Sequence, residues 1–177
     1  MTQEVWNKFM AKVNPPTAGT YKIDINHTTN VTGAGWTGLL GTEGSTVTIN
    51  GDKFTMFGGI QGTRDRATAG DVSRDFAFND GAGVGIGLRM EGLPGGTYNV
   101  NTYNYDPGYP GLVNVEFREA GLSSTTQFKV TGKSLTESAA TSFQIVVVAG
   151  KNYEIIVREA SIEDRSRFNG ISITLAP

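Results

Sequence analysis

Aromatic and amide side chains alternate along residues 93–107, and their chemistry suits a polar, ring-shaped ligand. Tyr103 and Tyr105 offer flat apolar rings, whereas Asn99 and Asn101 offer planar hydrogen-bonding groups. The segment begins with a Pro-Gly-Gly turn and continues with β-branched and aromatic residues, which is typical of a half-buried antiparallel strand. Because side chains along a strand alternate between its two faces, these four residues are expected on one face. That face is a candidate binding platform.

Sugar rings stack their apolar C–H faces on aromatic rings, and their hydroxyls exchange hydrogen bonds with amides, carboxylates and guanidinium groups. The stacking candidates are Trp36, Tyr103, Tyr105 and Tyr109. The hydrogen-bonding candidates are Arg64, Arg66, Asn99, Asn101, Asn104, Asp106 and Asn114. For Trp36 a structural alternative, in which the indole fills the core, is equally open.

A second segment, residues 113–118, repeats the alternation. Its apolar side chains point one way, which leaves Asn114, Glu116 and Arg118 on the other face. If this strand pairs with residues 96–105 across the loop between them, the two polar rows adjoin. The sequence then predicts one continuous polar and aromatic surface.

Catalytic chemistry has a narrower basis. His27 is the only histidine in the chain, so a metal site built on several histidines is excluded. Paired carboxylates can hydrolyse glycosides, and the candidates are Asp65, Asp75, Asp80, Asp106, Glu116, Glu163 and Asp164. Most of them have an arginine as a neighbour in the sequence, which favours ion pairs that brace loops. We therefore predict a protein that is not an enzyme, with a carboxylate-based carbohydrate-active enzyme as the less favoured alternative.

Composition limits the partners and the location. The formal net charge is −2, and no basic aromatic stripe appears, so nucleic acid is not an expected partner. Cysteine is absent, which removes disulfides and thiolate metal sites. The first residues lack the pattern of a signal peptide, and no segment is long and apolar enough for membrane insertion. The chain is therefore either intracellular or a module of a larger secreted protein.

The length of 177 residues fits one domain. Residues 2–13 have helical spacing and end at two prolines, so residues 1–18 are predicted as an N-terminal helix or linker and residues 19–177 as a single β-sandwich. About eleven short strands separated by turn signals support an all-β sandwich. They are expected at 20–26, 46–50, 53–58, 74–79, 85–91, 96–105, 111–119, 126–131, 142–149, 152–159 and 168–175.

Turns and long loops complete this prediction. Asn50-Gly51 is a strong hairpin signal, and residues 149–152 are read in the same way. The strands flanking residues 149–152 are apolar on both faces or nearly so, which predicts central positions in a sheet. The polar, glycine-rich segments 27–45 and 59–73 are expected to be functional loops.

The segment from Leu93 to Asp106 resembles the strand and loop of galactose-binding-like jelly rolls that are attached to bacterial polysaccharide-degrading enzymes and surface proteins. The segment from Arg167 to Ile173 is similar to the last strand of such modules. The resemblance implies a two-sheet antiparallel jelly roll and a non-catalytic carbohydrate-binding module, with its site on the loop tips or on a sheet face. It also implies a structural Ca²⁺, for which Asp24, Asp71 and Glu163 are the candidate ligands.

We therefore expect a polysaccharide-binding module, extracellular or at the cell surface, that anchors a larger protein to its glycan. The alternative is a structural or adhesive domain of a virion or cell-surface assembly, in which the exposed tyrosines and asparagines contact another protein.

Overall fold

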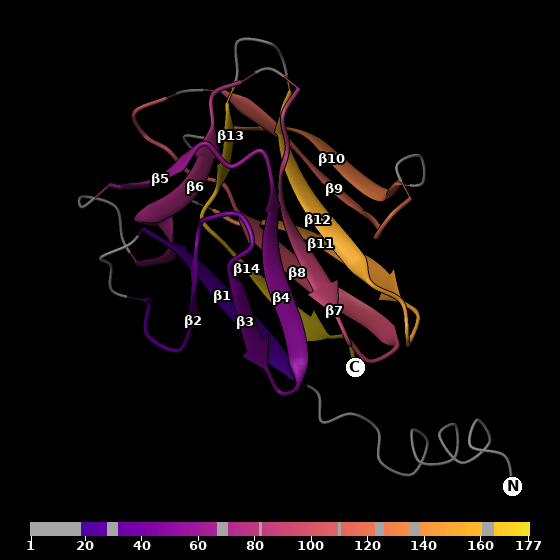
Figure 1. Ribbon diagram of the computed structural model, residues 1–177. Helices are drawn as coiled ribbons and strands as arrows, with labels where there is room; N and C mark the ends of the chain where they lie inside the picture. The colour runs from indigo at the N-terminus through magenta and orange to yellow at the C-terminus, as the bar shows by residue number, and fades with distance from the viewer. Residues whose placement is uncertain are drawn as a thin grey trace, which may run out of the picture.

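The computed structural model of the protein describes residues 19–27, 32–66, 71–81, 83–109, 111–122, 126–134, 139–160 and 165–177. These residues form fourteen β-strands and one turn of 3-10 helix, η1 (Asp71–Ser73), in two large sheets and one small sheet (Figure 1). The helix predicted over residues 2–13 lies outside the described residues, as does the rest of the predicted segment 1–18. Within the described ranges, no helix has the length and hydrophobicity that a membrane crossing requires.

Sheet A has five strands in the order β11-β8-β14-β1-β2. They are β1 (Thr20–Asn26), β2 (Thr37–Leu40), β8 (Gly96–Tyr103), β11 (Thr141–Val147) and β14 (Gly170–Leu175). All neighbours in this sheet are antiparallel except β1 and β2, which are parallel. The sheet is therefore the predicted antiparallel type with one parallel pair at its edge.

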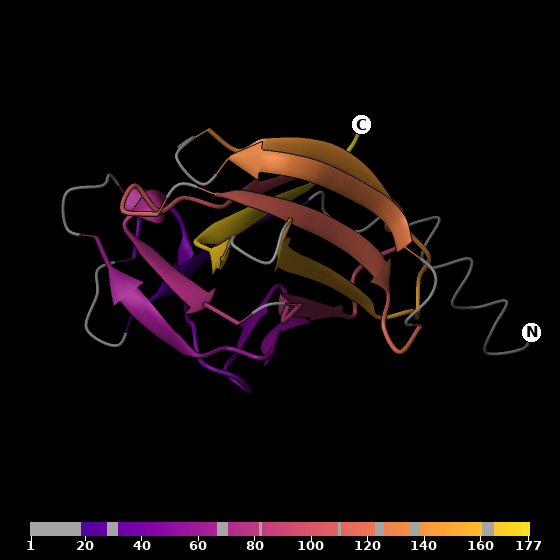
Figure 2. The same cartoon turned by 90° about the horizontal axis from the view of Figure 1, so that it is seen from above.

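Sheet B has six strands in the order β10-β9-β12-β7-β4-β3, all of them antiparallel to their neighbours. They are β3 (Thr46–Ile49), β4 (Asp52–Gly58), β7 (Ile86–Glu91), β9 (Leu112–Glu119), β10 (Thr126–Ser134) and β12 (Tyr153–Glu159). In Figure 2, the orange strands β9 and β10 curve side by side along one edge of the molecule.

Sheet C is a three-stranded sheet, β13-β6-β5, at one end of the sandwich (Figure 1). Its strands are β5 (Gly62–Asp65), β6 (Asp75–Asn79) and β13 (Ser166–Phe168). The two loops predicted from glycine and polar content thus contain short strands, β2 and β5. Their four-residue sequences, TGLL and GTRD, lack the alternation of apolar and polar residues that marks a strand.

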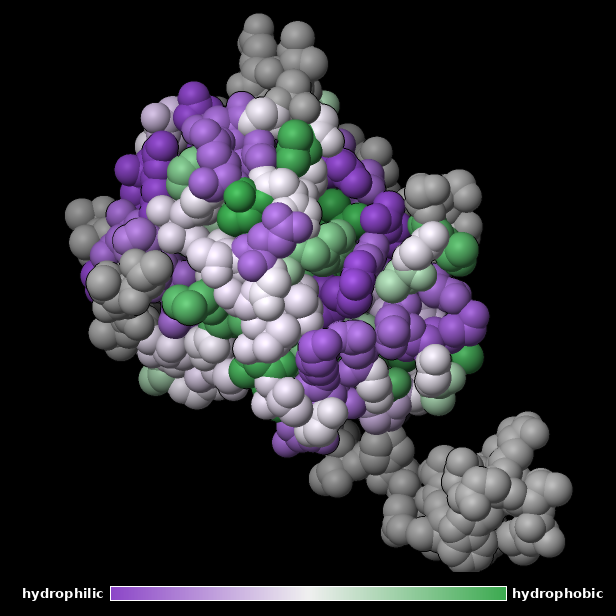
Figure 3. Space-filling model, viewed as in Figure 1, coloured by the Kyte–Doolittle hydropathy of each residue, from purple (hydrophilic) through white to green (hydrophobic). Residues whose placement is uncertain are grey.

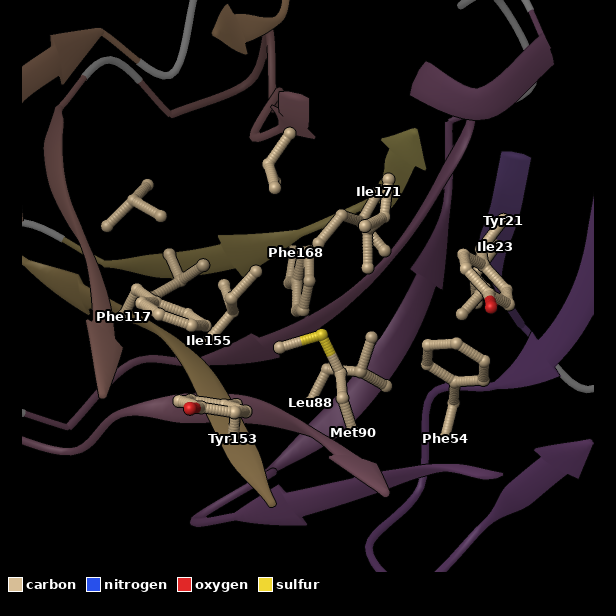
Figure 4. Packing of buried hydrophobic residues seen from close by; sticks show 14 of the residues in the cluster. Tyr21, Ile23, Phe54, Leu88, Met90, Phe117, Tyr153, Ile155, Phe168 and Ile171 are labelled. Atoms are coloured by element: carbon tan, nitrogen blue, oxygen red, sulfur yellow. The ribbon is translucent and has the colours of Figure 1, made fainter. Parts of the chain in front are cut away.

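The hydrophobic core lies between sheets A and B, and Figure 4 shows part of it. Side chains from both sheets interdigitate there, including Ile23 and Ile171 from sheet A and Leu88 and Ile155 from sheet B, each with 0% of its surface exposed. The odd–even alternation of the strands explains this arrangement, because every second residue points inward. The predicted β-sandwich is confirmed.

Of the two hairpin turns predicted from the sequence, one joins neighbouring strands and the other joins two sheets. Asn50 and Gly51 both have positive φ, 56° and 93°, and they close the predicted hairpin between β3 and β4. The turn at 149–152 instead carries the chain from β11 in sheet A to β12 in sheet B. The prediction of two central strands is therefore right for β12 and wrong for β11, an edge strand whose Val146 is 57% exposed.

Candidate functional site

The outward side of sheet A carries rows of amide and hydroxyl groups, here called the polar face. Its members are Thr20, Lys22, Asn99, Asn101, Ser142, Gln144, Ser172 and Thr174, with Trp36 and Tyr103 at one end. The face follows from the strand period: Tyr98 and Val100 are 1% exposed and Thr102 is 0% exposed, so Asn99 and Asn101, which alternate with them, point outward. The predicted alternation is confirmed for Asn99, Asn101 and Tyr103, whereas Tyr105 lies beyond the end of β8.

Hydrogen bonds between neighbouring strands hold the amides of the polar face. Gln144 Nε2 on β11 donates to Asn99 Oδ1 on β8 over 2.9 Å. Asn101 Nδ2 donates to Ser172 Oγ on β14 over 3.0 Å, and Ser142 Oγ donates to Asn101 Oδ1 over 2.6 Å. These pairs lie directly opposite one another in the strand register, so the face presents fixed donors and acceptors.

An aromatic pair borders the polar face. The rings of Trp36 and Tyr103 meet edge to face, with their centroids 5.5 Å apart and an interplanar angle of 81°. Lys22 Nζ lies 5.9 Å from the centroid of the Trp36 ring. Both aromatic residues are half-buried, and Trp36 is not a member of the core between sheets A and B. The alternative in which Trp36 fills the core is therefore not the one observed.

A tight turn before β2 presents Trp36. The Trp36 amide donates to the Gly33 carbonyl over 3.0 Å, and Gly35 has a φ of 77°, which favours glycine. Asp24, predicted as a calcium ligand, is buried with 1% exposure, and its Oδ2 accepts a 2.8 Å hydrogen bond from the Gly33 amide. In this structure Asp24 fixes the turn that positions Trp36.

Three predicted residues, Arg64, Arg66 and Tyr109, meet at sheet C. Arg165 and Arg167, which were not predicted, join them, and the four arginines around the Tyr109 ring are here called the guanidinium cluster. Their guanidinium carbons lie 5.7, 5.8, 4.0 and 5.6 Å from the Tyr109 ring centroid, in that order. Phe76 and Phe78 of β6 lie beneath, with the Arg64 guanidinium 4.6 Å from the Phe78 centroid. Figure 3 shows strongly hydrophilic side chains gathered over sheet C.

Asp106 lies under the guanidinium cluster and is fully buried. Its Oδ1 accepts from Arg66 Nε over 3.1 Å, and its Oδ2 accepts from Arg167 Nε over 3.0 Å. The carboxylate therefore positions arginines and does not face a ligand, which corrects the ligand-contact role predicted for it. Asn104 is buried too, and its amide donates to the Arg167 carbonyl over 2.7 Å.

Tyr105 follows β8 directly, between the polar face and the guanidinium cluster in the sequence. Its amide donates to Asn169 Oδ1 over 2.6 Å, and Asn169 Nδ2 donates to the carbonyls of Ser73, Asp75 and Tyr105. Asn169 thus ties η1, β6 and the β8 loop together. The Tyr105 ring is half-buried and, among the described residues, makes none of the ring or cation contacts seen at Tyr103 and Tyr109.

Asn114 belongs to neither group. It lies on β9 in sheet B, opposite Arg158 on β12, whereas β8 pairs with β11 and β14 in sheet A. The predicted pairing of these two segments is therefore wrong, and their polar rows cover opposite sides of the sandwich. The residues between β8 and β9 span the two sheets, which a sequence pattern alone does not distinguish from a hairpin.

The remaining metal candidates lie outside what the structure describes. The Asp71 side chain and all of Glu163 fall in this category, and the described side chains contain no group of three or more carboxylates, histidines or cysteines placed to hold a metal. The calcium site stays a prediction.

Among the carboxylates considered for catalysis, the five that the structure describes lie beside arginines, whereas Glu163 and Asp164 lie outside the described residues. Asp65 accepts two hydrogen bonds from Arg74, Asp80 lies 2.9 Å from Arg167, and Glu116 lies 3.5 Å from Arg158. Asp75 and Asp106 also face guanidinium groups. The prediction that these carboxylates brace loops and strands is confirmed for these five.

No protein-family model and no curated protein matches the sequence. Solved structures do resemble it. TmCBM61, in complex with β-1,4-galactotriose, is 12% identical over 70% of this chain and 88% of its own, with a TM-score of 0.46. The xylan-binding module CBM15 is 8% identical over 90% and 97%, with a TM-score of 0.44. The K2 cleaved adhesin domain of Lys-gingipain is 16% identical over 89% and 100%, with a TM-score of 0.45.

Carbohydrate-binding modules are thus among the solved structures to which this chain is similar. The chain also matches parts of larger enzymes: xylanase 10C from Cellvibrio japonicus is 10% identical, with a TM-score of 0.43, and 28% of that enzyme is covered. At these identities, similarity of fold assigns no ligand to this chain.

Sequence reasoning missed several members of both groups. Gln144 and Ser142 alternate with buried residues on β11, so their outward direction could be predicted from the sequence. Their position beside Asn99 and Asn101 depends on strand order, which the sequence pattern does not give. Arg167 is 0% exposed in the middle of β13, where no local sequence pattern marks a buried charge.

Proposed function

We propose that this protein is a non-catalytic glycan-binding module and that the polar face is its binding surface. The observation that carries the proposal is the row of hydrogen-bonded amides and hydroxyls on β11, β8 and β14 that ends at Trp36 and Tyr103. Sugar hydroxyls need both donors and acceptors, and the side chains of this face supply both. The aromatic rings at its end supply apolar surface for a C–H face of a sugar.

The amides of the polar face are arranged before any ligand arrives. Asn99 Oδ1 is occupied by Gln144, which leaves Asn99 Nδ2 to donate away from the sheet. A fixed amide loses less conformational freedom on binding than a free one, so preorganisation favours affinity. The wide, open arrangement on a sheet suits a chain of sugar residues better than a single monosaccharide.

The same proposal covers the larger protein to which this module belongs and the location of that protein. A module of this kind anchors a larger polypeptide to its polysaccharide, at the cell surface or outside the cell. The arginine partners of Asp65, Asp80 and Glu116 support the absence of catalysis, because glycoside hydrolysis needs two carboxyl groups that flank the scissile bond.

The experiment is affinity electrophoresis of the purified chain in gels that contain galactan, xylan, dextran or starch, followed by titration calorimetry on any polymer that retards it. The double variant Asn99→Ala/Asn101→Ala is expected to lose retardation. Asn114→Ala is the matched control, since it removes the same amide from the opposite side of the sandwich. Retardation that survives the double variant, or that is lost in the control, contradicts the assignment of the face.

An edge strand favours a second candidate function. β11 is an edge strand of sheet A, and Val146 on it and Val148 just after it are each 57% exposed. An exposed edge can pair with a strand of another protein, as in a structural or adhesive assembly. Absence of retardation in every gel directs the search to a protein partner at this edge.

A further inference from the structure

The guanidinium cluster holds more positive than negative charge. Among the residues that the structure describes, the carboxylates paired with its arginines are Asp106, which faces Arg66 and Arg167, and Asp80, which faces Arg165 and Arg167. Four guanidinium groups thus share two carboxylates. Among the described residues, the cluster therefore has two more guanidinium groups than paired carboxylates, on a protein whose formal net charge is −2.

The arginines of the cluster fall into two roles. Arg167 is 0% exposed, and its nitrogens donate to Asp106, Asp80 and the carbonyls of Asn79 and Ser166. Its hydrogen-bond donors are used within the protein, so its role is structural. Arg66, Arg165 and Arg64 are half-buried at the surface.

Arg64 is the arginine best placed to receive a ligand. No described carboxylate lies within ion-pair distance of it, while its guanidinium lies 4.6 Å from the Phe78 ring centroid and 5.7 Å from that of Tyr109. Hydrogen bonds from Arg64, and then from Arg165, lower the pKa of the Tyr109 phenol. These contacts hold the planar guanidinium in place and leave its charge unpaired. A fixed, planar guanidinium matches the geometry of a carboxylate or a sulfate.

We propose that the guanidinium cluster binds the acidic group, a carboxylate or a sulfate ester, of an anionic polysaccharide, with Arg64 and Arg165 as the contacting residues and Tyr109 between them. The inference rests on the proposed glycan-binding function and gives it a substrate class. The cluster is separate from the polar face. Neutral sugars of a polymer therefore contact the polar face, and its acidic groups contact the guanidinium cluster.

The test uses pairs of polymers that differ in charge. Polygalacturonate is compared with the same polymer after methyl esterification, and dextran sulfate is compared with dextran, by affinity electrophoresis and calorimetry. We expect the wild-type chain to bind the charged member of one pair at least about tenfold more tightly, and to lose this preference as salt is raised. The pair that shows the preference identifies the carboxylate or the sulfate as the source.

Arg64→Gln is the diagnostic variant, because it removes a charge without leaving a described carboxylate unpaired. It is expected to weaken binding of the acidic polymer about tenfold and to leave binding of the neutral polymer unchanged. Lys151→Gln is the matched control: it removes one positive charge from a side chain that is 52% exposed in the turn between β11 and β12, where it pairs with Glu119. It is expected to change neither affinity.

The outcomes separate the two proposals. Equal binding of the charged and neutral members, with the neutral polymers still bound, overturns the acidic-group proposal and leaves the glycan-binding function in place. A preference for charge that Arg64→Gln and Lys151→Gln reduce equally also overturns it, because such binding depends on net charge alone. Failure to bind any polymer overturns the glycan-binding function itself.

Discussion

The outer faces of sheets A and B are produced by the same alternation of side chains, yet they carry different groups. On sheet B the outward residues are largely charged and lie in ion pairs: Glu154 with Arg89 and Arg118, and Lys53 with Glu91. On sheet A they are amides and hydroxyls that end at two aromatic rings. Hydrophilic side chains also cross the sheet B side of the molecule in Figure 3.

Under the proposed function, sheet B contributes stability and sheet A contributes recognition. Ion pairs on sheet B satisfy one another, so a ligand gains little by displacing them. Amides on sheet A hold each other in place and still offer donors and acceptors to a hydroxylated ligand. Polarity alone therefore does not mark a binding surface. It is more informative to know whether each polar group is held in an ion pair or can still form hydrogen bonds with a ligand.

The largest expected effect is on the stability of sheet B. Glu154 has a side chain that is 3% exposed between Arg89 and Arg118, so Glu154→Ala removes the anion from two guanidinium groups. We expect the free energy of unfolding to fall by about 2 kcal/mol. This is less than the loss for a fully buried pair, because the Arg89 side chain is 43% exposed. Urea denaturation measures this change. Polymer binding by the folded variant should be unchanged, and a loss of binding would break the comparison.

The next effect is on recognition by sheet A. Tyr103→Ala removes one ring of the aromatic pair at the end of the polar face and is expected to weaken polymer binding at least about tenfold, or about 1.4 kcal/mol. Tyr103→Phe keeps the ring and should bind nearly as the wild type does. Because Tyr103 is at the surface, urea denaturation should show a loss of stability below about 1 kcal/mol. Equal binding by the alanine and phenylalanine variants contradicts a stacking role.

A smaller effect tests whether the amides are positioned by their neighbours. Gln144→Ala removes the donor to Asn99 Oδ1 and is expected to weaken polymer binding about threefold. Adding Gln144→Ala to Asn99→Ala should then have little further effect, since the two residues act as a unit. Calorimetry on the two single variants and the double variant gives this coupling. Additive losses indicate that Gln144 contacts the ligand itself.

The smallest effect concerns tyrosine ionisation and appears only at alkaline pH. Burial and the nearby Asp52 raise the pKa of Tyr98 to about 12, from 10.0, whereas guanidinium groups lower that of Tyr109. The Tyr98 contribution to stability is complete below pH 10 and is lost as the pH rises towards about 12. Ultraviolet absorbance of tyrosinate should show one early phase that Tyr109→Phe removes. If the early phase persists in that variant, the guanidinium cluster does not surround Tyr109 in solution.

The sequence predicts the strands of this fold well because most of them alternate apolar and polar residues around Gly-rich turns. The segment 96–105 is an example: its buried and outward residues follow from the period of two, and its observed strand is Gly96–Tyr103. Strand order is different, because it depends on contacts between segments far apart in the sequence. For that reason the pairing of β8 with β9 and the central position of β11 were predicted wrongly.

The same limit applies to the candidate sites. The common face of Asn99, Asn101 and Tyr103 could be predicted from the alternation of one strand. Trp36 lies beside them only because Asp24 holds the turn that positions it. Arg64 and Arg66 were readable as charged loop residues, but Arg165 and Arg167 reach the same ring from a segment about 100 residues later, a distance no local pattern bridges.

The central claim is that the polar face of sheet A, and not sheet B, contacts the glycan. Nuclear magnetic resonance of the side-chain amides tests it most directly, with polymer fragments titrated into ¹⁵N-labelled protein and signals assigned through single alanine variants. The account predicts that the NH₂ signals of Asn99 and Asn101 shift in proportion to bound ligand while that of Asn114 stays in place. A shift at Asn114 without shifts at Asn99 and Asn101 would contradict it.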